Sequence, residues 1–381
     1  MASFSPNVQD IVQNFGLTKH IEKLEKNNLL FMLIEKFTEV DLHPSKVDNH
    51  LMGSIFEELL RKFSEMSNET SGEHYTPRDI VNLLVSLVFS PETKVLSKPN
   101  KIVSLYDPCC GTGGMLTVGK EWIHKNVSKD VEVNMFGQEL NPQTYSICKS
   151  DFLITNEQPE NIKLGSTLSE DGYQDNNRKF DYMICNPPYG VDWKKDKEYV
   201  INEAKQSGGR FSVGTPRISD GQLLFLQHMI SKMEPNGSRI GVVFNGSPMF
   251  VGDAGSGESE IRKWLIENDL LATIVQLPDS MFFNTGITTY IWIISNKKTP
   301  ERIGKVQLIN GSAYFNILRK KLGDKRKEIS KENLSDILEA YLNFEENDHS
   351  KIFDNSYFGY SRILIEQPLV EDGEIKKTKN D

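Results

Sequence analysis

The sequence predicts an α/β fold, a doubly wound and mostly parallel sheet preceded by a small cap of helices. Three observations lead to this prediction. Apolar residues in the first seventy positions have helical spacing, short apolar runs alternate with helical stretches from about Lys101 onward, and turn-forming segments follow two of those runs. With 381 residues, the chain is long enough for one large catalytic domain with smaller additions.

The N-terminal region is expected to be helical. Apolar residues between Ile21 and Phe37 fit a helical face loosely, and those between Leu51 and Phe63 fit it better. A polar loop should follow over 66–72, and Thr76-Pro77 then opens another helix, because proline is favoured in a first helical turn. We therefore divide the chain into an N-terminal helical cap (1–70), a catalytic domain (71–315) and a charged C-terminal helical extension and tail (316–381) with one helix near 334–341.

Six short apolar runs are the candidate strands of the sheet. They cover residues 102–106, 131–136, 180–184, 240–244, 272–277 and 288–294. The last two are separated by about ten residues that include Pro278 and Gly286, too few for a helical crossover, so this pair should be antiparallel.

The composition excludes several classes of protein. No apolar run is long enough to cross a bilayer, and the first residues lack a basic region followed by an apolar stretch, so we expect no membrane association and a cytoplasmic location. The four cysteines have neither metal-ligand nor disulfide-framework spacing, and we interpret them as reduced packing residues, with no metal bound.

A glycine-rich turn follows the first candidate strand, in the segment Asp107-Pro108-Cys109-Cys110-Gly111-Thr112-Gly113-Gly114. Glycines there let the backbone approach a nucleotide-like ligand closely, although a tight connection without a ligand would read the same way. Glu139, at the end of the second strand, stands where this fold holds ribose hydroxyls. The alternative of a phosphate-binding loop over 114–120 fails, because Glu121 replaces the Ser or Thr that would bind magnesium.

The segment Asn186-Pro187-Pro188-Tyr189 follows the third long apolar run. It could be an ordinary turn, but its two prolines fix the backbone so that the Asn186 amide and the Pro187 carbonyl converge on one point, with the Tyr189 ring nearby. Two oxygen acceptors on the hydrogens of a planar aromatic amine would favour the pyramidal geometry in which its lone pair is free. This arrangement therefore predicts chemistry on such an amine.

These segments, in this order, resemble the gamma-order amino-methyltransferases, and among them the modification subunit of type I restriction-modification systems, in a short variant. The resemblance also includes residues 72–78, Phe283-Asn284-Thr285-Gly286 and the run 343–369, and it covers about residues 45–370. It implies a seven-stranded Rossmann-like methyltransferase sheet with an antiparallel terminal strand and S-adenosyl-L-methionine as cofactor.

The resemblance also implies the site residues. The catalytic set is Asn186, Pro187, Pro188 and Tyr189, with Tyr189 and Phe283 stacking on the substrate base. The cofactor set is Glu73, Tyr75, Thr76, Pro77, Asp107, Gly111, Thr112, Gly113, Gly114, Glu139, Ser166 and Asn186. This chain departs from the family at Ser166, where an acidic residue is usual, and at Tyr189, where type I subunits more often have Phe.

The implied reaction is methyl transfer to the exocyclic N6 amine of a flipped adenine in DNA. Three alternatives stay open: an N4-cytosine DNA methyltransferase, a glutamine-amide protein methyltransferase, and a non-catalytic scaffold of the same fold. The net charge of −9 is unfavourable for unaided DNA binding. Lys194, Lys195, Arg210 and Arg217 could contact phosphates, but solvated surface is the commoner role of such residues. We therefore expect a specificity subunit and a second methyltransferase subunit as partners besides DNA, with a restriction subunit as a further candidate.

Overall fold

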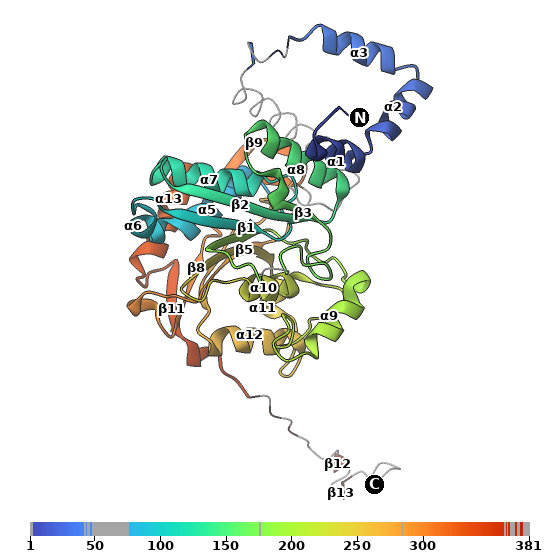
Figure 1. Ribbon diagram of the computed structural model, residues 1–381. Coiled ribbons are helices and arrows are strands. Elements are labelled where there is room, and N and C mark those ends of the chain that lie inside the picture. The colour runs from blue at the N-terminus through green and yellow to red at the C-terminus, as the bar shows by residue number, and fades with distance from the viewer. Residues whose placement is uncertain are drawn as a thin grey trace.

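The computed structural model describes residues 3–41, 43, 46–47, 76–174, 177–283 and 285–361, with positions 363, 365, 370–371 and 374–375 beyond them. The strands of the central sheet are β1 (Ile102–Asp107), β2 (Glu132–Glu139), β3 (Ile162–Leu164), β4 (Tyr182–Cys185), β5 (Arg239–Asn245), β6 (Leu271–Gln276), β7 (Thr289–Ser295), β8 (Lys305–Asn310) and β11 (Ser350–Asp354). Within the described residues they form one nine-stranded sheet in the order β11-β8-β6-β7-β5-β4-β1-β2-β3 (Figure 1).

The sheet confirms the mostly parallel, doubly wound arrangement. All six expected strands are present, and β7 runs antiparallel to both β5 and β6, as the short connection before it required. The sheet is wider than the seven strands expected, because β8 pairs with β6 and β11 pairs antiparallel with β8. Strand β8 has three apolar residues, Val306, Leu308 and Ile309, which are too few and too closely set among polar ones to stand out in the sequence. Two of them, Val306 and Ile309, are buried.

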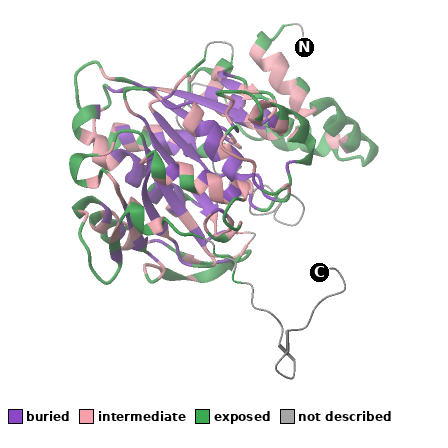
Figure 2. Ribbon diagram, turned by 90° about the horizontal axis from the view of Figure 1, so that it is seen from below, coloured by how far each residue is buried: buried purple, intermediate pink, exposed green. Residues whose placement is uncertain are grey.

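Helices cover both faces of the sheet. The helices α5 (Arg78–Phe89), α7 (Gly114–Asn126), α8 (Pro142–Ile154) and α13 (Lys331–Asn343) contribute to one apolar cluster, and α10 (Gln222–Ser231) and α12 (Gly257–Glu267) to a second one on the other face. Figure 1 shows the two groups on opposite sides of the strands, and Figure 2 shows the buried residues concentrated in the sheet between them. The remaining short elements are α6 (Thr93–Leu96), α9 (Lys197–Ala204), α11 (Ser247–Phe250), β9 (Asn316–Leu322), β10 (Lys325–Glu328), β12 (Val370–Glu371), β13 (Glu374–Ile375) and 3₁₀ turns at Ser90–Glu92, Pro159–Asn161, Lys194–Asp196, Pro300–Arg302 and Asn355–Phe358.

The expected N-terminal helices are present as α1 (Pro6–Phe15), α2 (Leu17–Lys26) and α3 (Leu30–Thr38). Helix α1 packs on α8, where Asp10 accepts hydrogen bonds from the Tyr145 hydroxyl and the Lys149 amine, each at 2.8 Å. The expected helix over 51–63 and loop over 66–72 lie outside the described residues. The helix expected after Thr76-Pro77 is confirmed as α5.

The C-terminal region differs from the helical extension expected over 316–381. Its predicted helix is confirmed as α13, but β9 and β10 form a hairpin and β11 joins the central sheet. These strands lie at the edge of the sheet or in a hairpin, and many of their charged side chains face solvent. Their sequences therefore show neither a clear helical period nor the apolar alternation of a half-buried strand. Among the described helices, none combines the length and the apolar character needed to span a membrane.

Candidate active site

The pairing of β1 with β4 brings the two predicted turns together. These neighbouring strands are parallel, with Leu105 opposite Tyr182 and Tyr106 opposite Met183, so both end at the same edge of the sheet. Just past those ends, the Cys109 and Cys185 sulfur atoms lie 3.1 Å apart. Strand β1 also pairs with β2 on its other side, so the order of the strands reverses here, which is where open α/β sheets bind ligands.

The glycine turn is a tight bend that leads directly into α7. Gly111 and Gly113 have φ angles of +55° and +84°, in the region that only glycine enters at low cost. A Cβ atom on Gly113 would lie 2.8 Å from the Cys148 sulfur, so a larger residue would push α8 away. The segment 114–120 is part of α7, which excludes the phosphate-loop interpretation.

Glu139 links the glycine turn to the following loop. One carboxylate oxygen accepts a hydrogen bond from the Gly111 backbone N–H at 2.9 Å, and the other accepts one from the Asn141 N–H at 2.7 Å. The carboxylate is therefore fixed beside the turn.

Asn186 is oriented by hydrogen bonds at both ends of its amide. Its nitrogen donates to the Thr76 hydroxyl at 2.8 Å, and that hydroxyl in turn lies 3.7 Å from the sulfur of Met115 on α7. Its oxygen accepts a hydrogen bond from the Tyr189 hydroxyl. Among the described residues, the Pro187 carbonyl has no hydrogen-bond donor. The tetrapeptide therefore presents one free and one occupied oxygen acceptor.

Tyr189 is folded into the protein rather than extended toward solvent. Its ring is 9% exposed and meets Phe282 edge-on, with the ring centres 6.1 Å apart. Burial raises the pKa of Tyr189 well above its usual value, so its hydroxyl keeps the proton that it donates to Asn186. Phe282 is a neighbour that the sequence did not single out; the predicted stacking residue Phe283 contributes its carbonyl, which accepts from the Asp324 N–H at 2.7 Å.

The segment 165–172 lies next to the glycine turn and is held by Arg210. The guanidinium donates to the carbonyls of Thr167 at 2.8 Å and Leu168 at 3.0 Å, and it forms an ion pair with Glu203 of α9 at 2.7 Å. The Thr167 hydroxyl donates to the Pro108 carbonyl, which joins the segment to the glycine turn. Among the described residues, the Ser166 hydroxyl accepts a local hydrogen bond, from the Leu168 N–H at 3.3 Å.

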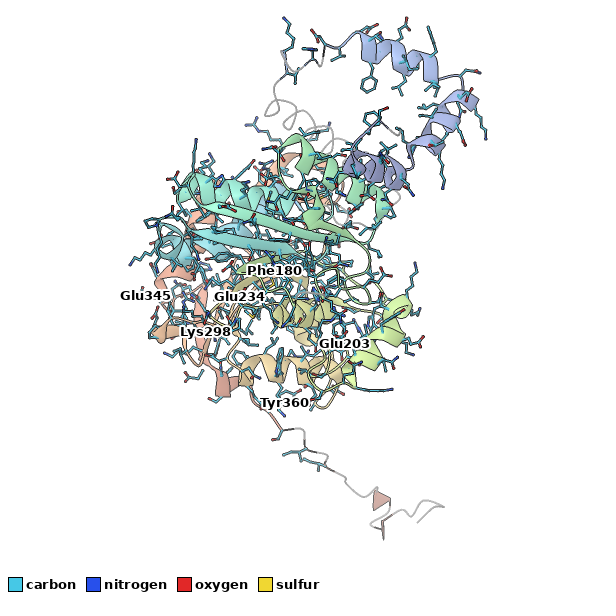
Figure 3. All side chains as sticks on the ribbon, viewed as in Figure 1. Phe180, Glu203, Glu234, Lys298, Glu345 and Tyr360 are labelled. Atoms are coloured by element: carbon cyan, nitrogen blue, oxygen red, sulfur yellow. The ribbon has the colours of Figure 1, made fainter. Side chains whose placement is uncertain are left out.

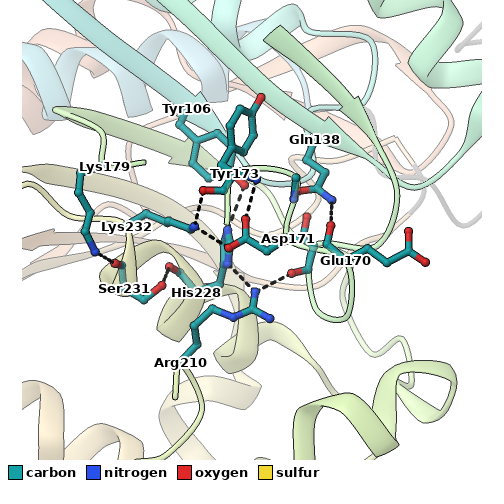
Figure 4. Close-up of polar contacts among 12 residues, drawn as sticks. Tyr106, Gln138, Glu170, Asp171, Tyr173, Lys179, Arg210, His228, Ser231 and Lys232 are labelled. Carbon is teal, nitrogen blue, oxygen red and sulfur yellow. Dashed lines mark hydrogen bonds and ion pairs between the residues drawn. The ribbon is translucent and has the colours of Figure 1, made fainter. Parts of the chain in front are cut away.

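Arg210 continues into a network of polar residues buried below the sheet (Figure 4). It donates to His228 Nδ1 at 2.9 Å, and an arginine can only donate, so the histidine proton must sit on Nε2, 3.0 Å from the Tyr106 hydroxyl. Burial, followed by the charge of Arg210, lowers the pKa of His228 to about 3, which keeps the ring neutral. Asp171 and Lys232 form a buried ion pair at 2.5 Å in the same network.

Three of the four basic residues singled out after the tetrapeptide form hydrogen bonds or ion pairs within the protein. Arg210 is an internal residue, which contradicts the suggestion that it could contact phosphates. Lys194 pairs with Asp192 at 3.2 Å, and Arg217 donates to Ser247 at 3.0 Å. The sequence could not show that the Arg210 side chain points inward, because its partner carbonyls are about forty residues away along the chain.

Burial perturbs the acid and the thiols between the two turns. It raises the pKa of Asp107 to about 7, although the carboxylate accepts a hydrogen bond from the Cys109 N–H at 3.0 Å. The hydrogen bond with Cys185, together with burial, raises the pKa of Cys109, and burial raises that of Cys185 to about 11. Ligand atoms of these three residues lie within 4.8 Å of one another.

The structure brings most of the predicted site residues to one place. Contacts link Thr76, Asp107, Gly111, Gly113, Glu139, Asn186 and Tyr189 along the ends of β1, β2 and β4. Glu73 and Tyr75 lie outside the described residues. Two surface hollows were found among the described residues, with volumes of about 350 and 420 Å³. The residues that line them lie near the starts of β1 and β2, at the end of the sheet opposite to the two turns. We place the site by the turns, because ligands of such sheets bind at the carboxyl ends of the strands.

The fold and the paired turns define the class of protein. A mostly parallel sheet with β7 reversed and with helices on both faces is the fold of S-adenosylmethionine-dependent methyltransferases. Residues 47–360 match the family model described as N-6 DNA Methylase, and the chain belongs to that family.

Named relatives agree with this family. The type I restriction enzyme MjaIX methylase subunit of Methanocaldococcus jannaschii is 27% identical over 90% of this chain and 57% of that protein. The HindI methylase subunit of Haemophilus influenzae is 30% identical over 68% of this chain and 54% of that protein. A crystal structure of a type I restriction-modification methyltransferase subunit from Streptococcus thermophilus matches with a TM-score of 0.70 and 25% identity, over 87% of this chain and 65% of that one. The chain spans a little over half the length of these two curated relatives.

Asp107 should make stability depend on pH. Its folded-state pKa is raised to about 7, so between about pH 4 and 7 the folded chain holds a proton that the unfolded chain has released, and stability falls as the pH rises. Urea unfolding of wild type and Asp107→Asn should therefore diverge, with wild type losing on the order of 2 kcal/mol relative to the variant from about pH 5 to 7. Asp336→Asn, at an exposed position of α13, is the control. Parallel curves for wild type and Asp107→Asn would contradict this account.

Proposed function

We propose that this chain transfers a methyl group from S-adenosyl-L-methionine to the N6 amine of an adenine flipped out of DNA, as the modification subunit of a type I restriction-modification system. The observation that carries the proposal is the placement of Asn186 and Pro187 at the same sheet edge as the glycine turn, with the Cys109 and Cys185 sulfur atoms 3.1 Å apart between them. A methyl donor in the turn and an amine on the tetrapeptide would then be neighbours.

The proposed cofactor contacts surround the turn. Glu139 would bind the ribose hydroxyls from its place beside the turn, and Gly111 to Gly114 would let the backbone approach the methionine part. Ser166 would face the cofactor's adenine on a segment fixed by Arg210. Glu73, Tyr75, Thr76 and Pro77 remain proposed contacts from the family resemblance.

The proposed chemistry is direct transfer. Bound S-adenosylmethionine supplies a methyl group on a positively charged sulfur. The Asn186 and Pro187 oxygens would accept the two amine hydrogens and make the nitrogen lone pair available. Transfer of that methyl group to the amine nitrogen would leave a neutral thioether and would release one amine proton to water. Neither a metal nor a covalent enzyme intermediate takes part.

In this proposal the base takes the place of the Tyr189 hydroxyl, which donates to the Asn186 oxygen in the structure. A rotation of the ring away from Phe282 would free the oxygen and place the ring where it can stack on the flipped base. Tyr189 thus has two proposed positions, one closed over the acceptor and one holding the substrate.

The proposal includes partners. In this proposal the chain acts in the cytoplasm with a specificity subunit, a second methyltransferase subunit and a restriction subunit, as the family resemblance implies. The names of its relatives, which are methylase subunits of type I restriction enzymes, agree with a role as one subunit of a larger enzyme. Cytosine N4 and glutamine amide are the rival acceptors, because both offer a similar planar nitrogen.

Replacing Asn186 with Ala should reduce methyl transfer at least about a hundredfold, since one of two acceptors for the reacting amine is lost. Tritiated cofactor and duplex DNA, with and without the specificity subunit, give the rate, and chromatography of hydrolysed DNA identifies the base. Cofactor affinity should stay within about threefold of wild type, as it should for the surface control Asn268→Ala.

Normal DNA methylation by Asn186→Ala would remove Asn186 from the mechanism. Labelled N4-methylcytosine or labelled protein from the wild type would instead establish one of the rival acceptors. Cofactor binding by wild type without any turnover, with the partner present, would identify a scaffold.

Tyr189→Phe and Tyr189→Ala separate the two proposed roles of the ring and the hydroxyl. The Phe variant removes the group that competes for the Asn186 oxygen but keeps the ring, so the KM for DNA should fall with kcat retained. The Ala variant loses the stacking surface, and transfer should drop about tenfold or more. Equal losses in both variants would show that the hydroxyl itself is needed.

Neutralising the Arg210–Glu203 pair should weaken cofactor binding without unfolding the protein. The double variant Arg210→Gln/Glu203→Gln removes both charges together, so neither is left buried alone, and the segment 165–172 loses its guanidinium support. We expect the cofactor Kd to rise about tenfold by calorimetry. The exposed pair Asp192→Asn/Lys194→Gln on the same stretch of chain is the matched control. An unchanged Kd in the Arg210 variant would restrict this pair to a structural role.

A further inference from the structure

A strongly basic hairpin lies close to the proposed catalytic pocket. Strands β9 and β10 form it, and residues 319–327 contain six lysines or arginines and one aspartate. The whole chain has a net charge of −9, whereas this stretch is positively charged. Such a local excess of positive charge is the usual footprint of a surface that binds a polyanion.

Two of the six cations anchor the hairpin to the body of the protein. Lys325 is 5% exposed and donates to Asp79 at 3.0 and 2.9 Å and to the Met281 carbonyl at 3.1 Å. Lys327 pairs with Asp279 and lies 4.0 Å from the centre of the Phe315 ring. These contacts fix the hairpin on the loop before β7 and on the first turn of α5.

The anchor points lie beside the catalytic tetrapeptide. Asp79 is three residues after Thr76, which holds Asn186, and Met281 precedes Phe282, which meets the Tyr189 ring. The hairpin backbone adds hydrogen bonds from Asp324 to the Phe283 carbonyl at 2.7 Å and from Arg326 to the Ser280 carbonyl at 3.0 Å. The hairpin is therefore attached to both segments that position the tetrapeptide side chains.

The other four cations of the hairpin are exposed. Within the described part of the chain, Arg319, Lys320, Lys321 and Arg326 have no carboxylate partner. The strand register gathers them, because Lys325 pairs with Leu322 and Lys327 with Ile317, which leaves Arg326 opposite residues 318–321. Four exposed positive charges therefore lie on neighbouring residues of a hairpin that is anchored to the body of the protein.

We propose that Arg319, Lys320, Lys321 and Arg326 bind phosphates of the DNA strand next to the flipped nucleotide. The inference rests on the proposed function and names a DNA contact for that site. A base flipped toward Asn186 keeps its backbone within a few nucleotides of the pocket, and the phosphates of one strand follow one another about every 3.4 Å along the helix axis. Four adjacent cations match a short run of such phosphates, and their long side chains reach it without base-specific contacts.

The test is the salt dependence of DNA binding by the full chain, alone and in complex with its specificity subunit. The variant carries Arg319→Gln, Lys320→Gln, Lys321→Gln and Arg326→Gln, which leaves the anchoring Lys325 and Lys327 in place. The control replaces Lys94, Lys98, Lys125 and Lys129 with Gln, four exposed lysines near the starts of β1 and β2. Fluorescence anisotropy with a labelled duplex of about 30 base pairs gives the Kd from about 50 to 200 mM salt. Cofactor affinity of each variant reports a folded catalytic domain.

We expect the hairpin variant to bind DNA at least about tenfold more weakly at low salt, with the slope of log K against log salt reduced by about two to four, and the control to match wild type. A hairpin variant with wild-type affinity and slope overturns the proposal. So does a variant that keeps both but no longer copurifies with the specificity subunit, because the hairpin would then bind protein.

Failure of the proposed function gives a different result. A wild-type chain that labels no DNA, while the hairpin variant still loses affinity and salt slope, refutes the methyl-transfer assignment and leaves the phosphate site standing. A wild type that methylates DNA and a hairpin variant that binds like it refute only the hairpin proposal.

Discussion

The register between β1 and β4 is the constraint on which the site depends. Ser104 and Asp181 hold it near the starts of the two strands: the Ser104 N–H and hydroxyl both donate to the Asp181 carboxylate, at 2.9 and 2.8 Å, and the Asp181 N–H donates back at 2.9 Å. A slip of one residue would turn every side chain of β4 to the other face. Cys185 would leave Cys109, and Asn186 would leave the glycine turn. A small polar contact at one end of the sheet therefore fixes the geometry of the chemistry at the other.

The sequence predicted the parts of the molecule whose pattern is local. Strand cores, the glycine turn and the Asn186-Pro187-Pro188-Tyr189 segment each carry their own pattern, and the ten-residue link before β7 was short enough to require an antiparallel pair. Strands β8 and β11 were not predicted, because they are held in the sheet mainly by pairing with strands distant in sequence. Strand β8 pairs with β6, and β11 pairs with β8. The basic hairpin was missed because its charges were averaged into an acidic chain and because its neighbours, Asp79 and Met281, are distant in sequence.

The role of Arg210 could not be predicted from the residues next to it in the sequence. In sequence it is one of several basic residues in a polar stretch, whereas in the structure it connects α9, the segment 165–172 and His228. Figure 3 shows its partner Glu203 on α9, at the edge of the molecule. The same view places Phe180 at the centre of the molecule, where its ring stacks on that of Tyr106 with the ring centres 4.3 Å apart. Burying charges is costly unless every hydrogen-bonding position is filled, and here carbonyls, a carboxylate and a neutral imidazole fill those of the guanidinium. As a result, a segment with little regular structure is fixed next to the glycine turn.

Tyr189, where the resembling type I subunits more often have Phe, contributes its hydroxyl to the site in this structure. Asn186 is only 8% exposed, and a buried amide oxygen without a donor costs roughly 1–3 kcal/mol. The Tyr189 hydroxyl supplies that donor in the structure, and in the proposed reaction an incoming amine would exchange one hydrogen bond for another, a nearly neutral step. A phenylalanine at this position offers no such donor, so the oxygen would have to bind water or stay unsatisfied. On the proposed function, the hydroxyl would stabilise the empty site at little cost to the occupied one. The energy for unstacking the base would then come from contacts outside the tetrapeptide, where the exposed cations of the hairpin lie.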